Sequence, residues 1–388
     1  MTAPIILDLG LVLLAAAAGG WLARRVGLPA VVGYLVVGLL VSPFTPGYVA
    51  DRNQIQLLAD VGVALLLFEV GIEIDIHRLR IEHRSLLLLA PLQVLITTTA
   101  SAAVLAAFGV DLNAALLIGL GIASSSAVVV VNITRSRRRT TDLETEREML
   151  GWSVIQDVAV VAAAAVVLGL AGVSKQGAVV GLAFFGAFVI FAAITAWVLP
   201  RILVRLRSEP DIFLIVSVAA GLAIAAVGDF FFHVPLALAA FIAGLAISES
   251  PETTEARERL LPFRDLFAVL FFVAVGSLID PTAIGESLPE IALTIALVFA
   301  TKIVVTYVLA RGARLARPGQ LAIGLGQVGE FSFVLVSAGA VAGVVPSEWF
   351  AGTLAAVVVT IAASAVAARL IHRDTPAVPT AANGAPAL

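Results

Sequence analysis

Residues 112–134 read LNAALLIGLGIASSSAVVVVNIT, and residues 318–344 read PGQLAIGLGQVGEFSFVLVSAGAVAGV. Both stretches are long and apolar enough to cross a bilayer as a helix, since about 20 residues span its core. Both are interrupted at mid-span by small and polar residues, which weaken a helix and free backbone carbonyls for a ligand. The breaks are predicted at Gly121 and Ser124 in the first stretch, and at Gly326, Gln327 and Gly329 in the second. We expect two discontinuous helices that cross near the membrane midplane. The alternative is that small residues only allow close helix packing.

The two stretches also belong to an internal repeat. Ile118-Gly119-Leu120-Gly121 matches Ile323-Gly324-Leu325-Gly326, at nearly the offset that relates two further blocks. These blocks are Pro29, Gly38, Leu39 and Ser42 with Pro235, Gly244, Leu245 and Ser248, and Val70, Gly71, Ile74 and Asp75 with Val275, Gly276, Ile279 and Asp280. Matching helices lie an odd number of predicted spans apart, so the second copy is inverted. Inverted repeats place a substrate site near the midplane, with access alternating between the two faces.

Apolar stretches recur along nearly the whole chain. The 388 residues are 60% hydrophobic and 13% charged, whereas a soluble domain is about 25% charged. The absence of cysteine excludes disulfides and thiolate metal sites. We predict an all-α membrane protein with about 13 transmembrane helices, inverted-topology repeats and two crossing discontinuous helices. The predicted helices lie at approximately 5–22, 28–46, 54–75, 84–108, 112–134, 149–172, 176–200, 210–228, 234–250, 262–280, 289–310, 318–344 and 348–370.

The transmembrane domain is predicted to span residues 1–373. Repeat one covers about 5–172, a linker helix covers 176–200, and repeat two covers about 210–370. The tail 374–388, rich in Pro and Ala, is predicted to be disordered. Of the 24 basic residues, 21 fall in turns on one side of the predicted spans. By the positive-inside rule, the N-terminus lies outside and the C-terminus is cytoplasmic in an inner membrane.

A carboxylate lies well inside the predicted helix 149–172, where Asp157 follows Gln156. A charged side chain at that depth costs about 2.5–3.5 kcal/mol and usually marks an ion or proton pathway. An aspartate binds a hard cation when ionised and a proton otherwise, which is the competition that cation/proton exchange requires. We expect Asp157 and Gln156 to form the ion site with Ser125 and Ser126. The structural alternative for Asp157 is a hydrogen bond between helices.

Three further charges lie inside predicted spans. Lys302 lies deep in the predicted helix 289–310. Its amine either deprotonates during transport or serves as a fixed counter-ion for Asp157 or Glu330. Glu330 follows the second break, where a structural role at the exposed helix ends is favoured over ion binding. Glu69, in helix 54–75, either lines an inner cavity or faces water. The run 324–329 matches a dinucleotide fingerprint, but it lies in an apolar span with no preceding strand and is rejected.

These motifs together resemble the second monovalent cation:proton antiporter family, which includes Kef-type potassium efflux systems and bacterial sodium/proton antiporters. The resemblance covers about residues 5–370. It is carried by RRVGLPAVVGYLVVGLL (24–40), LLLFEVGIEID (65–75), the serines at 124–126, VIQDVAVV (154–161), AAFIAGLAISES (239–250), FFVAVGSLID (271–280) and GLGQVGEFSFVL (324–335). The resemblance implies a homodimer with a dimerisation domain and a mobile core domain. It also implies that Asp157 binds potassium or sodium beside the crossing helices.

Two departures limit what the resemblance implies. Kef-type proteins usually continue into a cytoplasmic nucleotide-binding domain, so nucleotide or glutathione regulation is expected here only from a separate cytoplasmic subunit. Electrogenic sodium/proton relatives carry Asp-Asp where this chain carries Gln156-Asp157.

Two other transport classes remain as alternatives, a gated potassium channel and a sodium-coupled symporter of an organic solute. Flux coupled to a proton gradient would argue against the channel, and the LPAVVGYLVVG motif argues against the symporter. The sequence shows no nucleophile–base pair or metal cluster, so neither an enzyme nor a cofactor is predicted. No nucleic-acid partner is expected.

Overall fold

The computed structural model describes residues 2–42, 60–62, 64–65, 67–68, 71–72, 84–126, 129–130, 142–170, 178–206, 209–232, 234, 236–247, 266, 268–277, 285–329 and 331–370. Across these residues the chain is helical and contains no strand. Helical residues occur in each of the thirteen predicted ranges, which confirms the all-α class. The predicted tail 374–388 lies outside the described residues.

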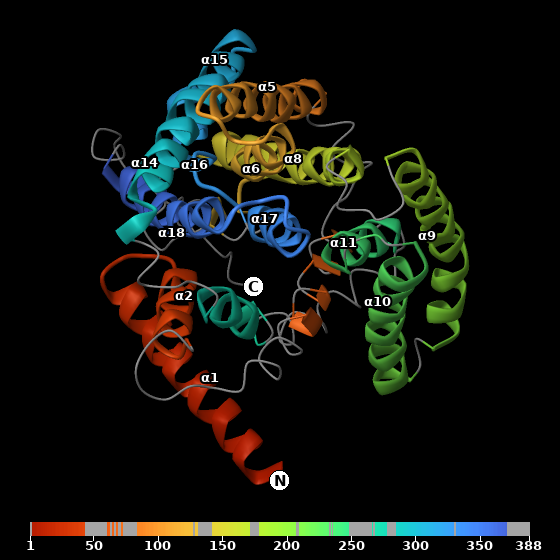
Figure 1. Cartoon of the computed structure of the whole chain (residues 1–388). Helices are drawn as coiled ribbons and strands as arrows, with labels where there is room; N and C mark the ends of the chain where they lie inside the picture. The colour runs from red at the N-terminus through yellow and green to blue at the C-terminus, as the bar shows by residue number, and fades with distance from the viewer. Residues whose placement is uncertain are drawn as a thin grey trace, which may run out of the picture.

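The helices form two groups around the middle of the molecule (Figure 1). The first group, which we call the core bundle, packs together in the upper half of the view. It comprises α5 (Leu86–Ala107), α6 (Leu112–Ala123), α8 (Leu143–Leu170), α14 (Leu288–Leu297), the π-helical turn η1 (Val298–Ile303), α15 (Val304–Gly312), α16 (Pro318–Gly324), α17 (Phe331–Val341) and α18 (Ser347–Leu370). The remaining labelled helices lie below and to the right, namely α1 (Thr2–Arg25), α2 (Ala30–Leu40), α9 (Ala178–Leu206), α10 (Pro210–Phe232) and α11 (Leu236–Ile247).

Seven helices in the described part of the chain are long and apolar enough to cross a membrane. Four shorter apolar helices accompany them, at Ala30–Leu40, Leu112–Ala123, Ala268–Ser277 and Phe331–Val341. Two of the short helices, α6 and α17, are short because their spans are broken, as the next section describes. The long α9 exposes large apolar side chains, including Ile190, Ile194 and Trp197, as a lipid-facing helix does.

Helix α8 begins at Leu143, earlier than the predicted start at 149. The earlier start is set by Asp142, whose carboxylate accepts hydrogen bonds from the Thr145 backbone N–H at 2.9 Å and hydroxyl at 3.0 Å. Asp is among the best residues for satisfying the free N–H groups of a first helical turn. Glu144 and Glu146 in that turn also favour the positive end of the helix dipole.

Glycines allow two close helix contacts that mirror each other. A Cβ added at Gly38 of α2 would lie 2.8 Å from the Cα of Gly276, in the segment Ala268–Ser277. A Cβ added at Gly244 of α11 would lie 3.0 Å from the Cα of Gly71. The repeat pairs Gly38 with Gly244 and Gly71 with Gly276, so each contact is the image of the other. This symmetry is consistent with the inverted repeat, whose limits remain a prediction.

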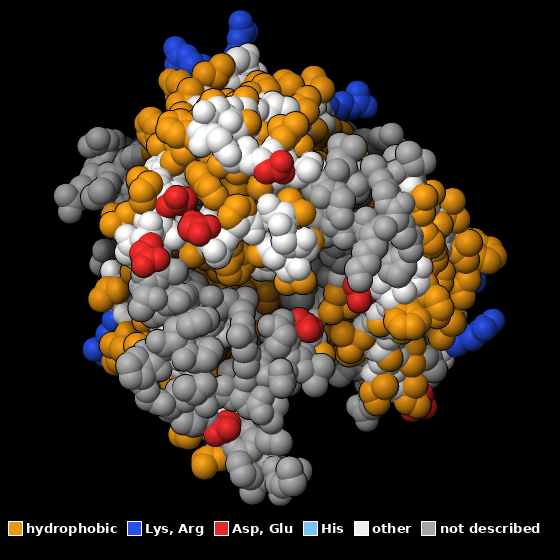
Figure 2. All heavy atoms as spheres, viewed as in Figure 1, with side chains coloured by type: hydrophobic (Ala, Val, Ile, Leu, Met, Phe, Trp, Pro, Cys, Tyr) orange, Lys and Arg blue, Asp and Glu red, His pale blue; other side chains and the backbone are white. Residues whose placement is uncertain are grey.

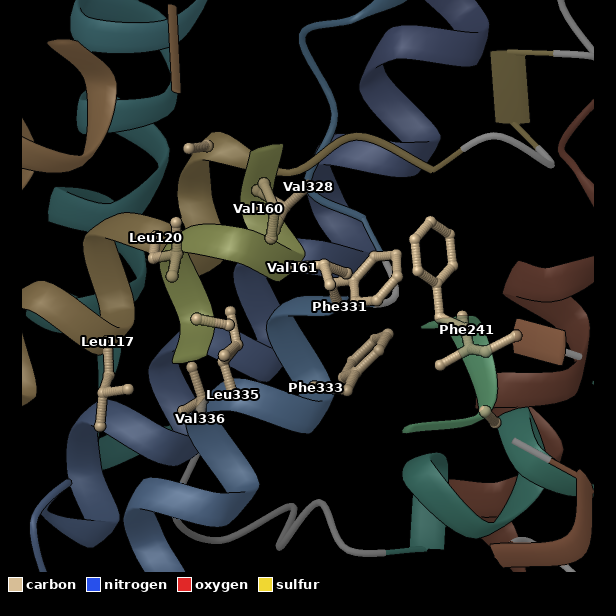
Figure 3. Packing of buried hydrophobic residues seen from close by; sticks show 14 of the residues in the cluster. Leu117, Leu120, Val160, Val161, Phe241, Val328, Phe331, Phe333, Leu335 and Val336 are labelled. Atoms are coloured by element: carbon tan, nitrogen blue, oxygen red, sulfur yellow. The ribbon is translucent and has the colours of Figure 1, made fainter. Parts of the chain in front are cut away.

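The core bundle meets α11 through aromatic side chains (Figure 3). Phe331 and Phe333 of α17 point toward Phe241 of α11. The rings of Phe241 and Phe331 pack edge to face, with centroids 5.6 Å apart. This contact connects the helix that follows the second break to α11.

The surface charges are unevenly distributed on the face shown in Figure 2. Asp and Glu side chains lie at several points across this face, whereas Lys and Arg side chains lie near its outline. Hydrophobic side chains cover much of the region of α9 and α10. The predicted orientation of the termini relative to the membrane remains a prediction.

Candidate functional site

The first break lies at the end of α6. Asp111 caps the helix start, where its carboxylate accepts from the Asn113 N–H at 2.9 Å, and the helix runs from Leu112 to Ala123. Ser124 is extended, with φ −75° and ψ 148°, so residues 124–126 leave the helix. Ser124, Ser125 and Ser126 are nevertheless at most 3% exposed, so their freed backbone groups need partners within the protein.

The second break separates α16 from α17. Helix α16 ends at Gly324, and residues 326–329 are not helical. Two hydroxyls of α18 bind this region: Ser364 Oγ donates to Ile323 O in the last turn of α16 at 2.7 Å, and Thr360 Oγ1 accepts from Val328 N in the non-helical segment at 3.3 Å. Helix α6 ends directly before Ser124, with Gly121 still inside it, and the non-helical residues after α16 include Gly326, Gln327 and Gly329.

The two breaks contact each other directly. Gly329 N donates to Ser124 O at 3.0 Å, and Ser125 Oγ donates to Leu325 O at 2.8 Å. The Gln327 amide pairs with Ser126 in both directions, accepting from its N–H at 2.7 Å and donating to its carbonyl at 3.2 Å. A Cβ at Gly329 would lie 2.5 Å from the carbonyl carbon of Ser125, so only glycine fits there. The two discontinuous helices therefore cross.

Lys302 binds both broken segments. Its Nζ donates to the carbonyls of Ser124 and Gln327, and the side chain is fully buried. The Ser124 carbonyl lies directly after the last residue of α6, where the helix dipole is negative and a cation is favoured. The geometry thus supports a structural component in the role of Lys302, which the sequence left open.

A π-helical turn places Lys302 at the crossing. The span 288–312 consists of α14, η1 and α15, and Lys302 is the fifth residue of the six in η1. π-turns inside α-helices are rare and occur often at functional sites, because the wider turn redirects the side chains that follow. The sequence predicted an uninterrupted helix here, and no glycine or proline marks the turn.

Asp157 and Gln156 lie in the middle of α8. Asp157 is 1% exposed, and its carboxylate is near enough to Lys302 to act on it electrostatically. Lys302 therefore connects Asp157 to the crossing. Ser153, one turn earlier on α8, has a buried Oγ with no hydrogen-bond partner in the described part of the protein. Asp157, Gln156 and Ser153 thus place three oxygen-bearing side chains within one helical turn.

The polar side chains of α5 were missed by the sequence prediction. Gln156 Nε2 donates to Gln93 Oε1, Gln93 Nε2 donates to Thr97 Oγ1 at 3.0 Å, and Thr97 Oγ1 donates to Thr301 O at 2.7 Å. Ser101 Oγ lies 2.9 Å from Thr301 Oγ1. The spacing 93, 97 and 101 puts these side chains on one helix face, which is the signal that could have identified them.

Two predicted residues, Glu330 and Glu69, lie outside the described residues. The predicted roles of both remain predictions. Among the described residues, no group of three His, Cys, Asp or Glu side chains is placed to hold a metal ion.

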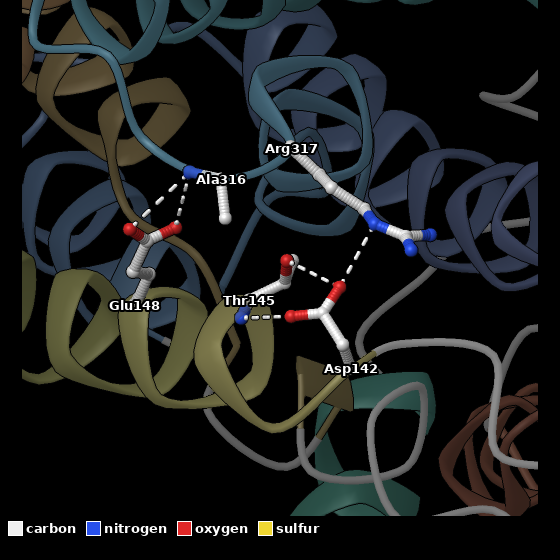
Figure 4. Close-up of polar contacts among 5 residues, drawn as sticks. All are labelled: Asp142, Thr145, Glu148, Ala316 and Arg317. Carbon is white, nitrogen blue, oxygen red and sulfur yellow. Dashed lines mark hydrogen bonds and ion pairs between the residues drawn. The ribbon is translucent and has the colours of Figure 1, made fainter. Parts of the chain in front are cut away.

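A second polar cluster lies at the N-terminal end of α8 (Figure 4). Arg317 Nε forms an ion pair with Asp142 Oδ2 at 2.8 Å. The Ala316 N–H lies 3.3 Å and 3.4 Å from the two Glu148 oxygens. Burial alone would raise the pKa of Asp142, but the Thr145 hydrogen bonds and the Arg317 charge outweigh it and lower this pKa below its usual value. The cluster fastens α8 to the turn between α15 and α16.

Comparison with known proteins identifies the family. The model of the family described as "Sodium/hydrogen exchanger, transmembrane" matches residues 12–370. The chain belongs to the sodium/hydrogen exchanger family. This family is a transmembrane one, so the apolar helices are those of a multi-pass membrane protein.

Two similar proteins extend this result. The chain is 30% identical over 372 residues to the putative cation/proton antiporter YbaL of Escherichia coli (strain K12), covering 91% of this chain and 66% of that protein. The chain thus spans slightly less than two thirds of this relative. The structure of the sodium proton antiporter MjNhaP1 from Methanocaldococcus jannaschii matches with a TM-score of 0.75 and 15% identity. That match covers 95% of this exchanger-family chain and 97% of MjNhaP1, which shows a shared fold.

Proposed function

We propose that the chain is a secondary antiporter that exchanges a monovalent cation for protons by alternating access at Asp157. The observation that carries this proposal is a buried carboxylate on α8 beside two crossing broken helices. Family membership supports the same transport class, and YbaL is described as a putative cation/proton antiporter. By the distribution of basic residues, the N-terminus lies outside the inner membrane.

Asp157 supplies the competition that couples the two fluxes. When ionised, it offers an oxygen anion to a hard alkali cation, and when protonated it offers none. Its burial disfavours a carboxylate that has neither ligand. One ligand is therefore taken as the other leaves, and the loaded site faces one side of the membrane at a time.

The crossing region adds two serines to the proposed ion site. Ser125 and Ser126 stay proposed members of the ion site, because the Ser125 hydroxyl donates its hydrogen to Leu325 O and keeps its oxygen lone pairs for a cation, while the Ser126 backbone groups pair with the Gln327 amide. Lys302 neutralises the freed carbonyls. The oxygens of Gln156 and Ser153 are the nearest candidates along α8 to complete the coordination of a cation at Asp157.

The proposed exchange is electroneutral, with one cation for one proton. Gln156 occupies the position beside Asp157 and cannot titrate, so a single carboxylate alternates between the two ligands. Each half-cycle then carries the same charge. In sealed proteoliposomes, an imposed membrane potential is expected to leave the initial exchange rate nearly unchanged. A strong acceleration by potential of either sign would show a second proton and implicate Lys302.

Proton flux in proteoliposomes tests the exchange itself. Purified protein is reconstituted with a pH-sensitive dye inside, and sodium, potassium, lithium or rubidium is added in turn, with choline as the control. An exchanger moves protons saturably when its own cation is added and does not respond to choline. Cation flux that ignores the proton gradient would instead indicate a channel, and flux that requires an organic solute would indicate a symporter.

A further inference from the structure

We propose that Gln93 and Thr97 of α5 form a relay that orients the Gln156 amide, so that its oxygen faces the cation at Asp157. In this proposal Gln93 and Thr97 are positioning residues that set cation affinity without touching the ion. The proposal rests on the function proposed above, and it deepens that function by naming residues outside the carboxylate site. It starts from three hydrogen bonds that join α8, α5 and η1.

The orientation of the relay follows from its far end. Thr301 O is a backbone carbonyl, which can only accept, so the Thr97 hydroxyl must donate to it. The Thr97 oxygen then accepts from Gln93, which must present its NH2 group. Gln93 consequently presents its oxygen to Gln156, and Gln156 must turn its own NH2 group toward Gln93. The hydrogen-bond network thus decides which end of each glutamine amide is oxygen and which is nitrogen. The shape of an amide group alone does not distinguish the two atoms.

The anchor of the relay is held in place by η1. The Thr301 hydroxyl donates to Leu297 O at 2.7 Å, so Ser101 must donate to Thr301. The next residue, Lys302, binds the crossing segments. One π-turn therefore positions both the residue that binds the broken helices and the residue that anchors the amide relay.

The relay leaves one oxygen without a protein partner. Gln156 is fully buried, and its Oε1 has no hydrogen-bond partner among the described residues. A buried acceptor without a partner is destabilising, and a bound cation is a group that satisfies an amide oxygen. An unanchored amide could rotate and present NH2 to the cation instead, so the relay favours the binding orientation.

Isosteric substitutions at Thr97 test the relay. Thr97→Val removes the donated hydrogen bond at nearly constant volume, and Thr97→Ser retains it. Thr99→Val on the same helix removes an exposed hydroxyl that bonds within its own helix to Leu95 O and Ile96 O, and it serves as the matched control. The cation concentration at half-maximal proton flux is measured for each variant, together with the maximal rate and the cation-induced rise in melting temperature.

The expected result is a rise in the half-saturating cation concentration of about threefold to tenfold in Thr97→Val, with a maximal rate near that of the wild type. Thr97→Ser and Thr99→Val are expected to match the wild type. In a Gln156→Leu background, Thr97→Val is expected to add nothing, because the relay acts through Gln156.

Two results would overturn the relay. One is unchanged half-saturation and unchanged cation-induced melting shift in Thr97→Val, and the other is an equal effect of Thr97→Val in the Gln156→Leu background. A wild-type protein that moves no protons on addition of any alkali cation would instead refute the proposed function. The melting shift then still reports whether Thr97 affects cation binding.

Discussion

Helix α8 contacts the rest of the core bundle through polar side chains at two levels, mid-span and its N-terminal end, which differ in burial. At mid-span, Gln156 and Asp157 face a network of α5 and η1 whose side chains are at most 7% exposed. At its N-terminal end, Asp142 pairs with Arg317, and these side chains are 36% and 34% exposed. Both levels join residues far apart in sequence, but the ion pair at the N-terminal end is partly exposed to solvent.

Burial decides how much each level contributes. An exposed ion pair stabilises by about 0–1 kcal/mol, because water and salt screen it. A buried group that loses its partner destabilises by about 1–3 kcal/mol, and by more if the group is charged. The buried mid-span interactions are therefore expected to fix the geometry of the site. The exposed ion pair at the N-terminal end of α8 is expected to contribute less stability, and its contribution should depend on pH and salt.

The largest expected effect on stability is that of Lys302→Ala. The substitution leaves the Ser124 and Gln327 carbonyls buried without their charged donor, which destabilises the fold by about 3 kcal/mol. Thermal unfolding in detergent measures this change, and exchange in proteoliposomes should be reduced but detectable. An unchanged melting temperature with complete loss of exchange would assign Lys302 a direct role in transport.

A smaller destabilisation is expected for Gly329→Ala. Its Cβ would lie 2.5 Å from the Ser125 carbonyl carbon, so the crossing must shift, at a cost of about 2 kcal/mol. Gly186→Ala in α9 is the matched control, because a Cβ there meets nothing within 4 Å. The control should unfold at or slightly above the wild-type temperature, since alanine favours a helix. Equal melting temperatures for the two variants would contradict the tight crossing.

The smallest effect is expected for Arg317→Ala, at about 0.5 kcal/mol or less near neutral pH. The pKa of Asp142 is lowered in the folded protein, so its contribution is present above the ordinary Asp pKa of about 3.9 and is lost as the pH falls through the lowered value. The difference in melting temperature between wild type and variant should therefore shrink in acid and in 1 M salt. A difference that persists under both conditions would show that the N-terminal level acts as a buried one.

The sequence predicted the features that have a local cause. Apolar length predicts the spans, and Gly121, Ser124 and Gly329 predict the breaks because small and polar residues weaken a membrane helix. The start of α8 was predicted too late, although Asp142 with Glu144 and Glu146 is a recognisable N-terminal pattern.

The relay and the π-turn have no such local cause. Thr97 bonds to Thr301, 204 positions away, and each residue alone resembles one of many small polar residues in a membrane span. Lys302 was singled out correctly as too deep for a surface lysine, but its partners are backbone carbonyls, which any sequence contains. Contacts of this kind follow from the three-dimensional crossing and not from spacing along one helix.

The most direct test of the account is cation-driven proton flux by Asp157→Asn in proteoliposomes. Asparagine keeps the size and polarity of the side chain but cannot alternate between a proton and a cation. Glu348→Gln, at an exposed carboxylate in the first turn of α18, is the control. We expect Asp157→Asn to elute as a folded protein, to retain its helical spectrum and to show no exchange with any alkali cation, whereas Glu348→Gln exchanges at the wild-type rate. Substantial cation-driven proton flux by Asp157→Asn would contradict the assignment of Asp157 as the exchange site.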